Sequence, residues 1–189
     1  MGIHRTFHNC IVAALWAVWL CAASFPVQAE ENVRLDRLLA DLQEADSDNA
    51  QRIARDIEHE WTKSGSPSAD LLLKRGRDAL EAGETEAAID HLTALTDHAP
   101  EFAEGWHMRA LAFASIERFG PAIADLEQAL ALEPRHFNAI ASLAGILYQV
   151  GYPDMSREAL EMVLELHPHH TQALDSLGAI DSDTGGADL

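Results

Sequence analysis

Three histidines lie within four residues near the C-terminal end of the sequence, in the segment His167-Pro168-His169-His170. Imidazole nitrogens are common ligands of divalent transition metals, so this segment could bind such an ion. However, Pro168 prevents one helix from aligning the three rings, and no carboxylate or cysteine lies nearby at a clear ligand spacing. We therefore predict an exposed polar turn, with no metal site and no cofactor, and keep metal handling by His167–His170 as an alternative function.

The sequence shows no arrangement typical of catalysis. Its 31 acidic residues are not paired as general acid–base chemistry requires. No glycine-rich phosphate loop follows a strand, and no serine is placed beside a histidine as nucleophile and base. We predict that the protein is not an enzyme. The acidic residues expected at outward, solvated helix positions are Glu81, Glu84, Glu86, Asp125, Glu127, Glu158, Glu161 and Glu165.

The chain is strongly acidic. Its 13 lysine and arginine residues against 31 aspartate and glutamate residues give a formal net charge of −18 at pH 7. Such a surface repels nucleic-acid phosphates and anionic lipid head groups. Nucleic acid is therefore excluded as a partner.

The first 29 residues have the pattern of a secretory signal peptide. A short polar stretch with Arg5 precedes an apolar run from Cys10 to Ala23, and Val27-Gln28-Ala29 supplies the small residues that a signal peptidase requires. The run is shorter than the roughly 20 apolar residues that a membrane span needs. We predict cleavage after Ala29 and a periplasmic or secreted protein. The alternative is a membrane anchor, in which this segment stays uncleaved.

Both cysteines of the sequence, Cys10 and Cys21, fall in this N-terminal segment. The processed chain would therefore have no disulfide, no thiolate nucleophile and no cysteine–zinc site. Its stability would come from its core alone.

Prolines recur at a spacing of 34 residues, at Pro100, Pro134 and Pro168. A fixed period of this length is the sequence signature of a solenoid. Each unit contains two amphipathic helical segments with a turn between them, and its closing proline ends the second helix. The units are residues 67–100, 101–134 and 135–168.

The aligned units share columns of similar side chains. Gly83 and Gly151 mark the central turn, where a residue past a helix end often has a positive φ. In the middle unit we expect the turn at residues 117–120, with Pro121 as the first residue of the second helix. The columns are Leu72, Trp106 and Ile140; Gly76, Ala110 and Ala144; Ala79, Phe113 and Leu147; Ala88, Ala122 and Ser156; and Leu92, Leu126 and Leu160.

In its period, its columns and its closing prolines the sequence resembles the tetratricopeptide repeat (TPR) family over residues 67–168. The resemblance implies an all-α fold, a right-handed α-solenoid of stacked antiparallel helix hairpins, with three 34-residue TPR units and flanking capping helices. Arg75 and Arg109 depart from the family pattern, which usually has leucine there, and Ser156 replaces an expected alanine.

The flanking segments have the features of caps, which cover the open apolar ends of a solenoid. Residues 30–66 are expected to form an N-terminal helical hairpin, either a degenerate repeat or a cap, with Trp61 in its core. Residues 169–181 are expected to form a C-terminal capping helix, and residues 182–189 a disordered tail.

The resemblance also implies that the first helices of consecutive units line a concave groove that holds a segment of another protein. Lys74 and Arg77 are basic residues in an acidic chain and favour an acidic partner segment. Alternatively, they pair with acids of the N-terminal hairpin, such as Asp56, Glu58 or Glu60. The predicted groove residues are Lys74, Arg77, Leu80, His107, Met108, Leu111, Asn138, Ser142, Tyr148 and Gln149.

One subgroup of the family clamps the C-terminal carboxylate of cytosolic chaperones with lysine, asparagine and arginine side chains. This sequence has Leu73, Arg77 and Asn138 at three of those positions, so the resemblance does not extend to that specificity. We predict a non-enzymatic adaptor of the bacterial cell envelope that binds a protein or peptide. A membrane-anchored envelope-assembly factor is a further alternative, and the pattern predicts no oligomeric state.

Overall fold

The computed structural model describes residues 26–185, with side chains for residues 33–182, and these residues form nine α-helices and no strand. The predicted signal peptide, residues 1–29, lies outside the described residues except for its last four, which begin helix α2 (Pro26–Glu44). The chain divides into two units, Met1–Arg37 and Leu38–Leu189, so α2 spans their boundary. Within residues 26–185, each helix is too short or too polar to reach across a bilayer.

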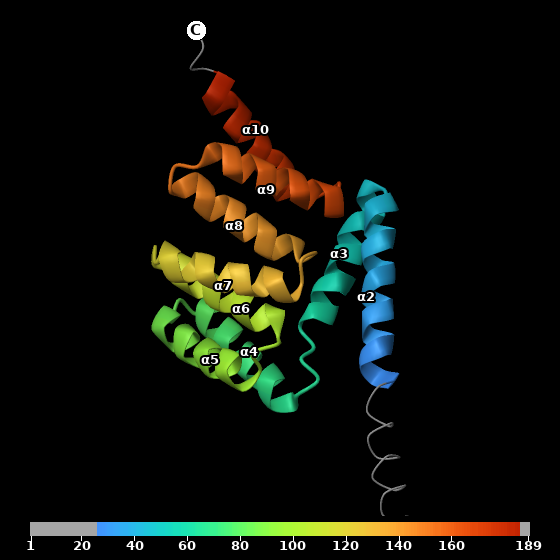
Figure 1. The fold of residues 1–189 in the computed structure, drawn as a ribbon, viewed down its shortest axis with the longest axis vertical. Coiled ribbons are helices and arrows are strands. Elements are labelled where there is room, and N and C mark those ends of the chain that lie inside the picture. The colour runs from blue at the N-terminus through green and yellow to red at the C-terminus, as the bar shows by residue number, and fades with distance from the viewer. Residues whose placement is uncertain (1–25, 186–189) are drawn as a thin grey trace, which may run out of the picture. The chain divides into compact units, whose positions relative to one another are not determined.

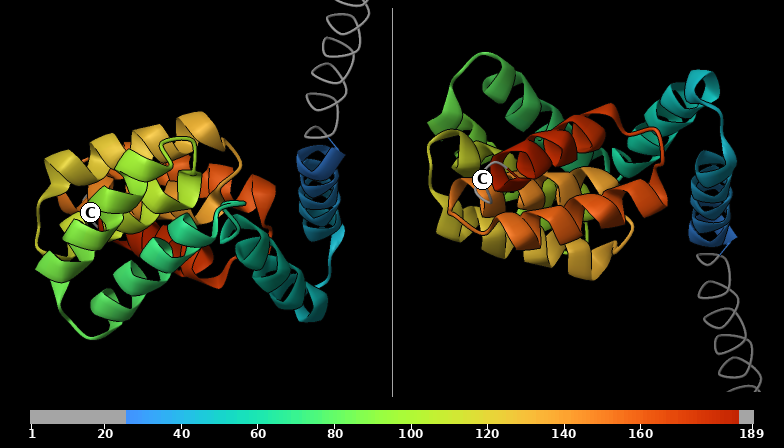
Figure 2. Two further views of the ribbon diagram at one scale, coloured as in Figure 1. Left: turned by 90° about the horizontal axis from the view of Figure 1, so that it is seen from below. Right: turned by 90° about the horizontal axis from the view of Figure 1, so that it is seen from above.

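Six helices of the second unit form three antiparallel hairpins that stack as an all-α solenoid (Figure 1). Figure 2 shows the same stack from below and from above. Each 34-residue repeat supplies one hairpin. Within the second unit, one further helix precedes the three hairpins in sequence and another follows them. The helices are α3 (Ser47–Trp61), α4 (Pro67–Glu81), α5 (Thr85–His98), α6 (Ala103–Ser115), α7 (Phe119–Leu132), α8 (Phe137–Gln149), α9 (Pro153–Leu166) and α10 (Thr171–Gly185).

The turn inside each hairpin contains one residue with a positive φ. These residues are Gly83 (φ 75°), Glu117 (φ 59°) and Gly151 (φ 89°), which are 34 residues apart. The prediction that Pro121 begins the second helix of the middle unit was wrong, because α7 begins two residues earlier at Phe119. Pro121 still lies in the first turn of α7, where a backbone N–H has no helical partner to lose.

The small-residue columns lie where two helices approach closely. A Cβ added to Gly76 of α4 would lie 2.5 Å from Leu92 Cγ of α5. Ala122 and Ser156, which share a column of the second helices, are both buried. Because protein interiors are close-packed, these positions exclude larger side chains.

The prediction that Asp125 lies on a solvated surface was wrong. Its side chain is buried and forms an ion pair with Arg109, which joins α7 to α6. Arg109 Nη1 also donates to Thr96 Oγ1 of α5 at 2.7 Å, and its guanidinium lies 4.8 Å from the ring centroid of Trp106. Helical spacing placed Asp125 outward because this spacing carries no information about a partner 16 residues away in sequence.

The C-terminal helix is longer than predicted. We expected a capping helix over 169–181 and a disordered tail over 182–189, but α10 begins at Thr171 and continues to Gly185. Ser182 Oγ donates to the carbonyl of Ala179 in its last turns. The helix ends at the first of two consecutive glycines, Gly185 and Gly186, and residues 186–189 lie outside the described residues.

Candidate functional site

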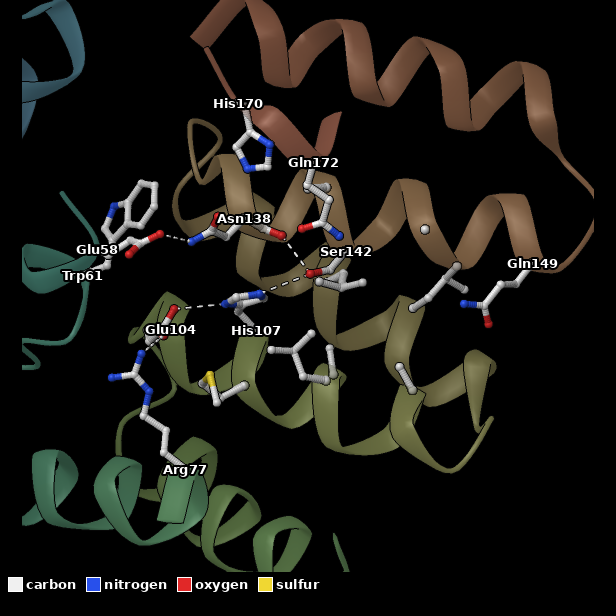
Figure 3. A pocket seen from close by; sticks show the side chains of 18 residues that line it. Glu58, Trp61, Arg77, Glu104, His107, Asn138, Ser142, Gln149, His170 and Gln172 are labelled. Atoms are coloured by element: carbon white, nitrogen blue, oxygen red, sulfur yellow. Dashed lines mark hydrogen bonds and ion pairs between the residues drawn. The ribbon is translucent and has the colours of Figure 1, made fainter. Parts of the chain in front are cut away.

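A cavity of about 530 Å³ opens along the first helices of the repeats, and we call it the groove (Figure 3). Its walls come from α4, α6 and α8, with further side chains from α3, from α7, and from His170 and the start of α10. Seven of the ten predicted residues line it. They are Arg77, His107, Met108, Leu111, Asn138, Ser142 and Gln149.

Three predicted residues lie elsewhere. Lys74 forms an exposed ion pair with Asp78 of its own helix, with Nζ 2.6 Å from Oδ2. Leu80 packs against the core of the first repeat. Tyr148 lines a separate cavity of about 130 Å³ with side chains of α9 and α10.

Two groove residues differ in character from what the sequence suggested. Met108 is buried in the core of the first two repeats, so its main role is packing. Arg77 does not pair with the N-terminal hairpin, because its Nη2 lies 3.5 Å from Glu104 Oε1. The alternative that Lys74 and Arg77 both pair with acids of that hairpin is therefore wrong.

Glu104 is the most deeply buried carboxylate of the groove, with 5% of its surface exposed. Burial by itself would raise the pKa of Glu104, but hydrogen bonds from His107 Nδ1 and His136 Nε2, both 3.0 Å long, outweigh it and lower the pKa to about 2. Glu104 is therefore a carboxylate at any physiological pH. It was missed because an acid in the first turn of a helix is common, and only its spacing to His107 pointed to a partner.

His136 is also absent from the predicted site, although it is fully buried beside the groove. It caps α8, since its Nδ1 accepts a hydrogen bond from the backbone N–H of Ala139 at 3.2 Å. The proton of the neutral ring therefore lies on Nε2, which donates to Glu104. Burial lowers the pKa of His136, which keeps the ring neutral.

A chain of hydrogen bonds runs from the groove surface to this buried carboxylate. Ser142 Oγ lies 2.8 Å from the carbonyl of Asn138 and 3.3 Å from His107 Nε2, and its hydroxyl can donate to either acceptor. His107 in turn donates from Nδ1 to Glu104. Because each member holds the next, this network fixes the orientation of the groove side chains before any partner binds.

Glu104, His107 and His136 are, among the described residues, the one group of three whose possible metal-ligand atoms converge, all within 4.8 Å. Two imidazoles and a carboxylate are a donor set that zinc uses. A neutral histidine that binds a metal through Nε2 carries its proton on Nδ1, however, and Nδ1 of His136 faces the N–H of Ala139. A metal ion on Nε2 would therefore set the Nδ1–H of His136 against the backbone N–H of Ala139 and remove the cap of α8. The cluster fits a hydrogen-bond network and not a metal site.

The histidine segment after α9 was predicted to be an exposed turn, which is wrong for His167. Its ring is buried and lies edge-on to Phe137 and His170, and its Nδ1 has no hydrogen-bond partner within the part of the chain that the structure describes. Burial, together with the neighbouring His170 and His169, lowers the pKa of His167 to about 4. A buried ring inside a repeat junction is a packing element.

Helix α3 supplies the side of the groove that the sequence did not predict. Asn138 Nδ2 donates to Glu58 Oε1 at 3.0 Å. The indole of Trp61 stacks on the ring of His136, with centroids 3.9 Å apart and planes 14° apart, and also contacts Phe137. Trp61 was expected in the core and is buried, but its partners belong to the third repeat.

No family model matches this sequence. It is 36% identical over 141 residues to a TPR repeat-containing protein of Rhizobium etli, an alignment that covers 74% of this chain and 67% of the relative. It is 26% identical over 116 residues to small glutamine-rich tetratricopeptide repeat-containing protein 2 of Saccharomyces cerevisiae. That match covers 61% of this chain but only 33% of the yeast protein.

Solved TPR domains share the fold. The first TPR domain of Spaghetti (RPAP3), bound to the HSP90 peptide SRMEEVD, superposes with a TM-score of 0.61 at 25% identity, over 64% of this chain and 95% of that domain. The second TPR domain of human RPAP3, in complex with the HSP70 peptide SGPTIEEVD, gives 0.54 at 27% identity, over 57% and 90%. MamA gives 0.59 at 24% identity, over 77% and 83%, and shows likeness of fold alone.

Proposed function

Because this chain belongs to the tetratricopeptide repeat family, we propose that it is a non-enzymatic adaptor that holds a segment of another protein in its groove. The groove is the observation that carries the proposal. Arg77, Asn138 and Gln149 offer guanidinium and amide groups along it, and Leu111 contributes apolar surface. Mixed polar and apolar lining of this kind suits a peptide, which presents backbone groups and side chains together.

We propose that the bound segment is acidic or presents a carboxylate. The two RPAP3 domains bind peptides that end in EEVD. In this groove Arg77 is the basic group, and its pairing with Glu104 is long enough, at 3.5 Å, for it to turn to a second carboxylate. Leu73 is buried and presents no charge to a partner, so the chaperone-type carboxylate clamp is not part of this proposal.

We further propose that the protein works in the bacterial cell envelope, in the periplasm or outside the cell. The support is the signal-peptide pattern of residues 1–29 and the absence of cysteine from the sequence after Cys21.

Site-specific photo-crosslinking in the native host tests the groove. A photoreactive residue at Gln149, which is exposed and lines the groove, should form covalent adducts with a partner. The matched control is Glu127, which is exposed on α7 and does not line the groove. We expect adducts at Gln149, and we expect Asn138→Ala to reduce their yield. Adducts only at Glu127, or equal adducts at both positions, would show that another surface binds the partner.

A further inference from the structure

Glu58 and Trp61 occupy one end of the groove and belong to the chain itself. They are three residues apart on α3, so they project from the same face of the helix. Glu58 accepts the amide donor of Asn138 (Figure 3). Trp61 covers the ring of His136. A carboxylate and an aromatic ring from α3 therefore occupy Asn138, which lines the groove, and the face of His136 beside it.

The docking of α3 is incomplete in one respect. Trp61 is buried, with 7% of its surface exposed, yet its indole N–H has no acceptor among the described residues. A buried donor without an acceptor opposes burial, while the stacking on His136 favours it. A partner that supplies the same ring and carboxylate, together with an acceptor for the ring N–H, would bind this end better than α3 does.

A short link joins α3 to the first repeat. α3 ends at Trp61 and α4 begins at Pro67, and Gly65 between them has a φ of 73° with open space around it. Pro67 starts α4 and keeps the helices separate. A short link of this kind holds α3 at a high effective concentration beside the groove, on the order of millimolar.

We propose that α3 is a resident competitor for the groove. Resting on the proposed adaptor function, this inference names the partner's chemistry: a helical segment that carries an acidic residue and, three positions later, an aromatic residue. Such a segment takes the places of Glu58 on Asn138 and of Trp61 on His136, and α3 leaves the groove as it binds. The partner must therefore outcompete a segment already tethered in place, which selects for partners that match both contacts.

A labelled peptide of residues 47–61 tests this with the purified protein. In the wild type the tethered α3 should exclude the peptide, because its effective concentration exceeds that of the probe. The variant Glu58→Gln/Trp61→Ala loosens α3, so the peptide should bind it saturably and at least roughly tenfold more tightly than it binds the wild type. Fluorescence anisotropy measures both.

Three controls make the result specific. Asp56→Asn changes an exposed ion pair of α3 with Arg52 and should leave peptide binding as in the wild type. A peptide with Gln and Ala in place of Glu58 and Trp61 should not bind the double variant. Adding Asn138→Ala to that variant should weaken the binding of the native peptide.

Two outcomes would overturn the inference: equal binding of the peptide to wild type and double variant, or no binding to either. If circular dichroism shows that the double variant is unfolded, Glu58→Gln alone, which keeps the indole, must show a smaller increase in peptide binding, and the inference fails if it shows none. Cross-links at Gln149 that persist when the peptide test fails would leave the adaptor function standing and remove only the competitor role of α3.

Discussion

Arg109 and Asp125 form a bidentate ion pair inside the second repeat, in which Arg109 Nε and Nη2 each lie 2.7 Å from a different carboxylate oxygen of Asp125. The pair joins α6 to α7. In the third repeat the same two columns hold Leu143 and Ala159. One repeat therefore uses an ion pair where another uses apolar contact.

We expect Asp125→Ala to lower the free energy of unfolding by about 3 kcal/mol, because it leaves the Arg109 guanidinium in the interior without its carboxylate. The double variant Arg109→Leu/Asp125→Ala copies the third repeat and should lose less than the single variant. Chemical denaturation of the wild type, both single variants and the double variant measures the coupling. A double variant less stable than Asp125→Ala would show that the unpaired Arg109 guanidinium is not what destabilises the single variant.

Glu117→Gly should raise the free energy of unfolding by about 0.5 kcal/mol. Glu117 has a φ of 59°, which costs an L-residue about 1–2 kcal/mol and costs glycine almost nothing, although glycine loses more chain entropy on folding. Glu127→Gly, in the interior of α7, is the control and should lose about 1 kcal/mol. Denaturation midpoints that fall for both variants would contradict the strain at Glu117.

The same substitution should have opposite effects at two helical glycines. Gly76→Ala places a methyl group against Leu92 and should destabilise by about 1–3 kcal/mol. Gly145→Ala meets nothing within 4 Å and should stabilise by about 0.5–1 kcal/mol through helix propensity. Thermal or denaturant unfolding of both variants checks this, and changes of the same sign would show that the close approach of α4 and α5 is not tight.

Acid should destabilise the protein in two steps. Burial lowers the pKa values of His136 and His167, the latter to about 4, so the unfolded chain takes up protons first as the pH falls below about 6.5. Stability should therefore fall between about pH 6.5 and 4. It should fall further between about pH 4.5 and 2, because Glu104 stays ionised in the folded protein to about pH 2.

Unfolding midpoints measured between pH 7.5 and pH 3 check the direction of this change. His167→Leu removes one of the titrating groups, so its stability should fall less than that of the wild type between pH 7 and pH 5. His98→Gln, at an exposed position, is the control and should follow the wild type. If His167→Leu loses as much stability as the wild type between pH 7 and pH 5, a group other than His167 causes the loss.

Export should remove residues 1–29. N-terminal sequencing of the protein recovered from the envelope or medium of its native host should begin at Glu30, since Val27-Gln28-Ala29 precedes that bond. Replacing Ala29 with a bulky residue such as Leu should block processing and keep the longer chain. An exported protein that still begins at Met1 would contradict the predicted signal peptide.

The repeat architecture was predictable from sequence, because it depends on local periodicity. The prolines at 34-residue spacing, the small residues at Gly76 and Ala122, and the helical spacing between them each report which face of a helix is buried. The prediction of an all-α TPR solenoid is confirmed by the structure and by the relatives. The resemblance to the TPR family implied ten groove residues, and seven of them line the groove.

The pairing of charged and polar groups was decided only by the tertiary structure. Glu104 meets His136 across 32 residues, and Asn138 meets Glu58 across 80. Such contacts depend on how one hairpin is rotated against the next and on which rotamer each long side chain adopts, and neither is encoded in the spacing of apolar residues. A charged residue at an outward position therefore looks the same in sequence whether it ends in water, as Glu127 does, or in a buried ion pair, as Asp125 does.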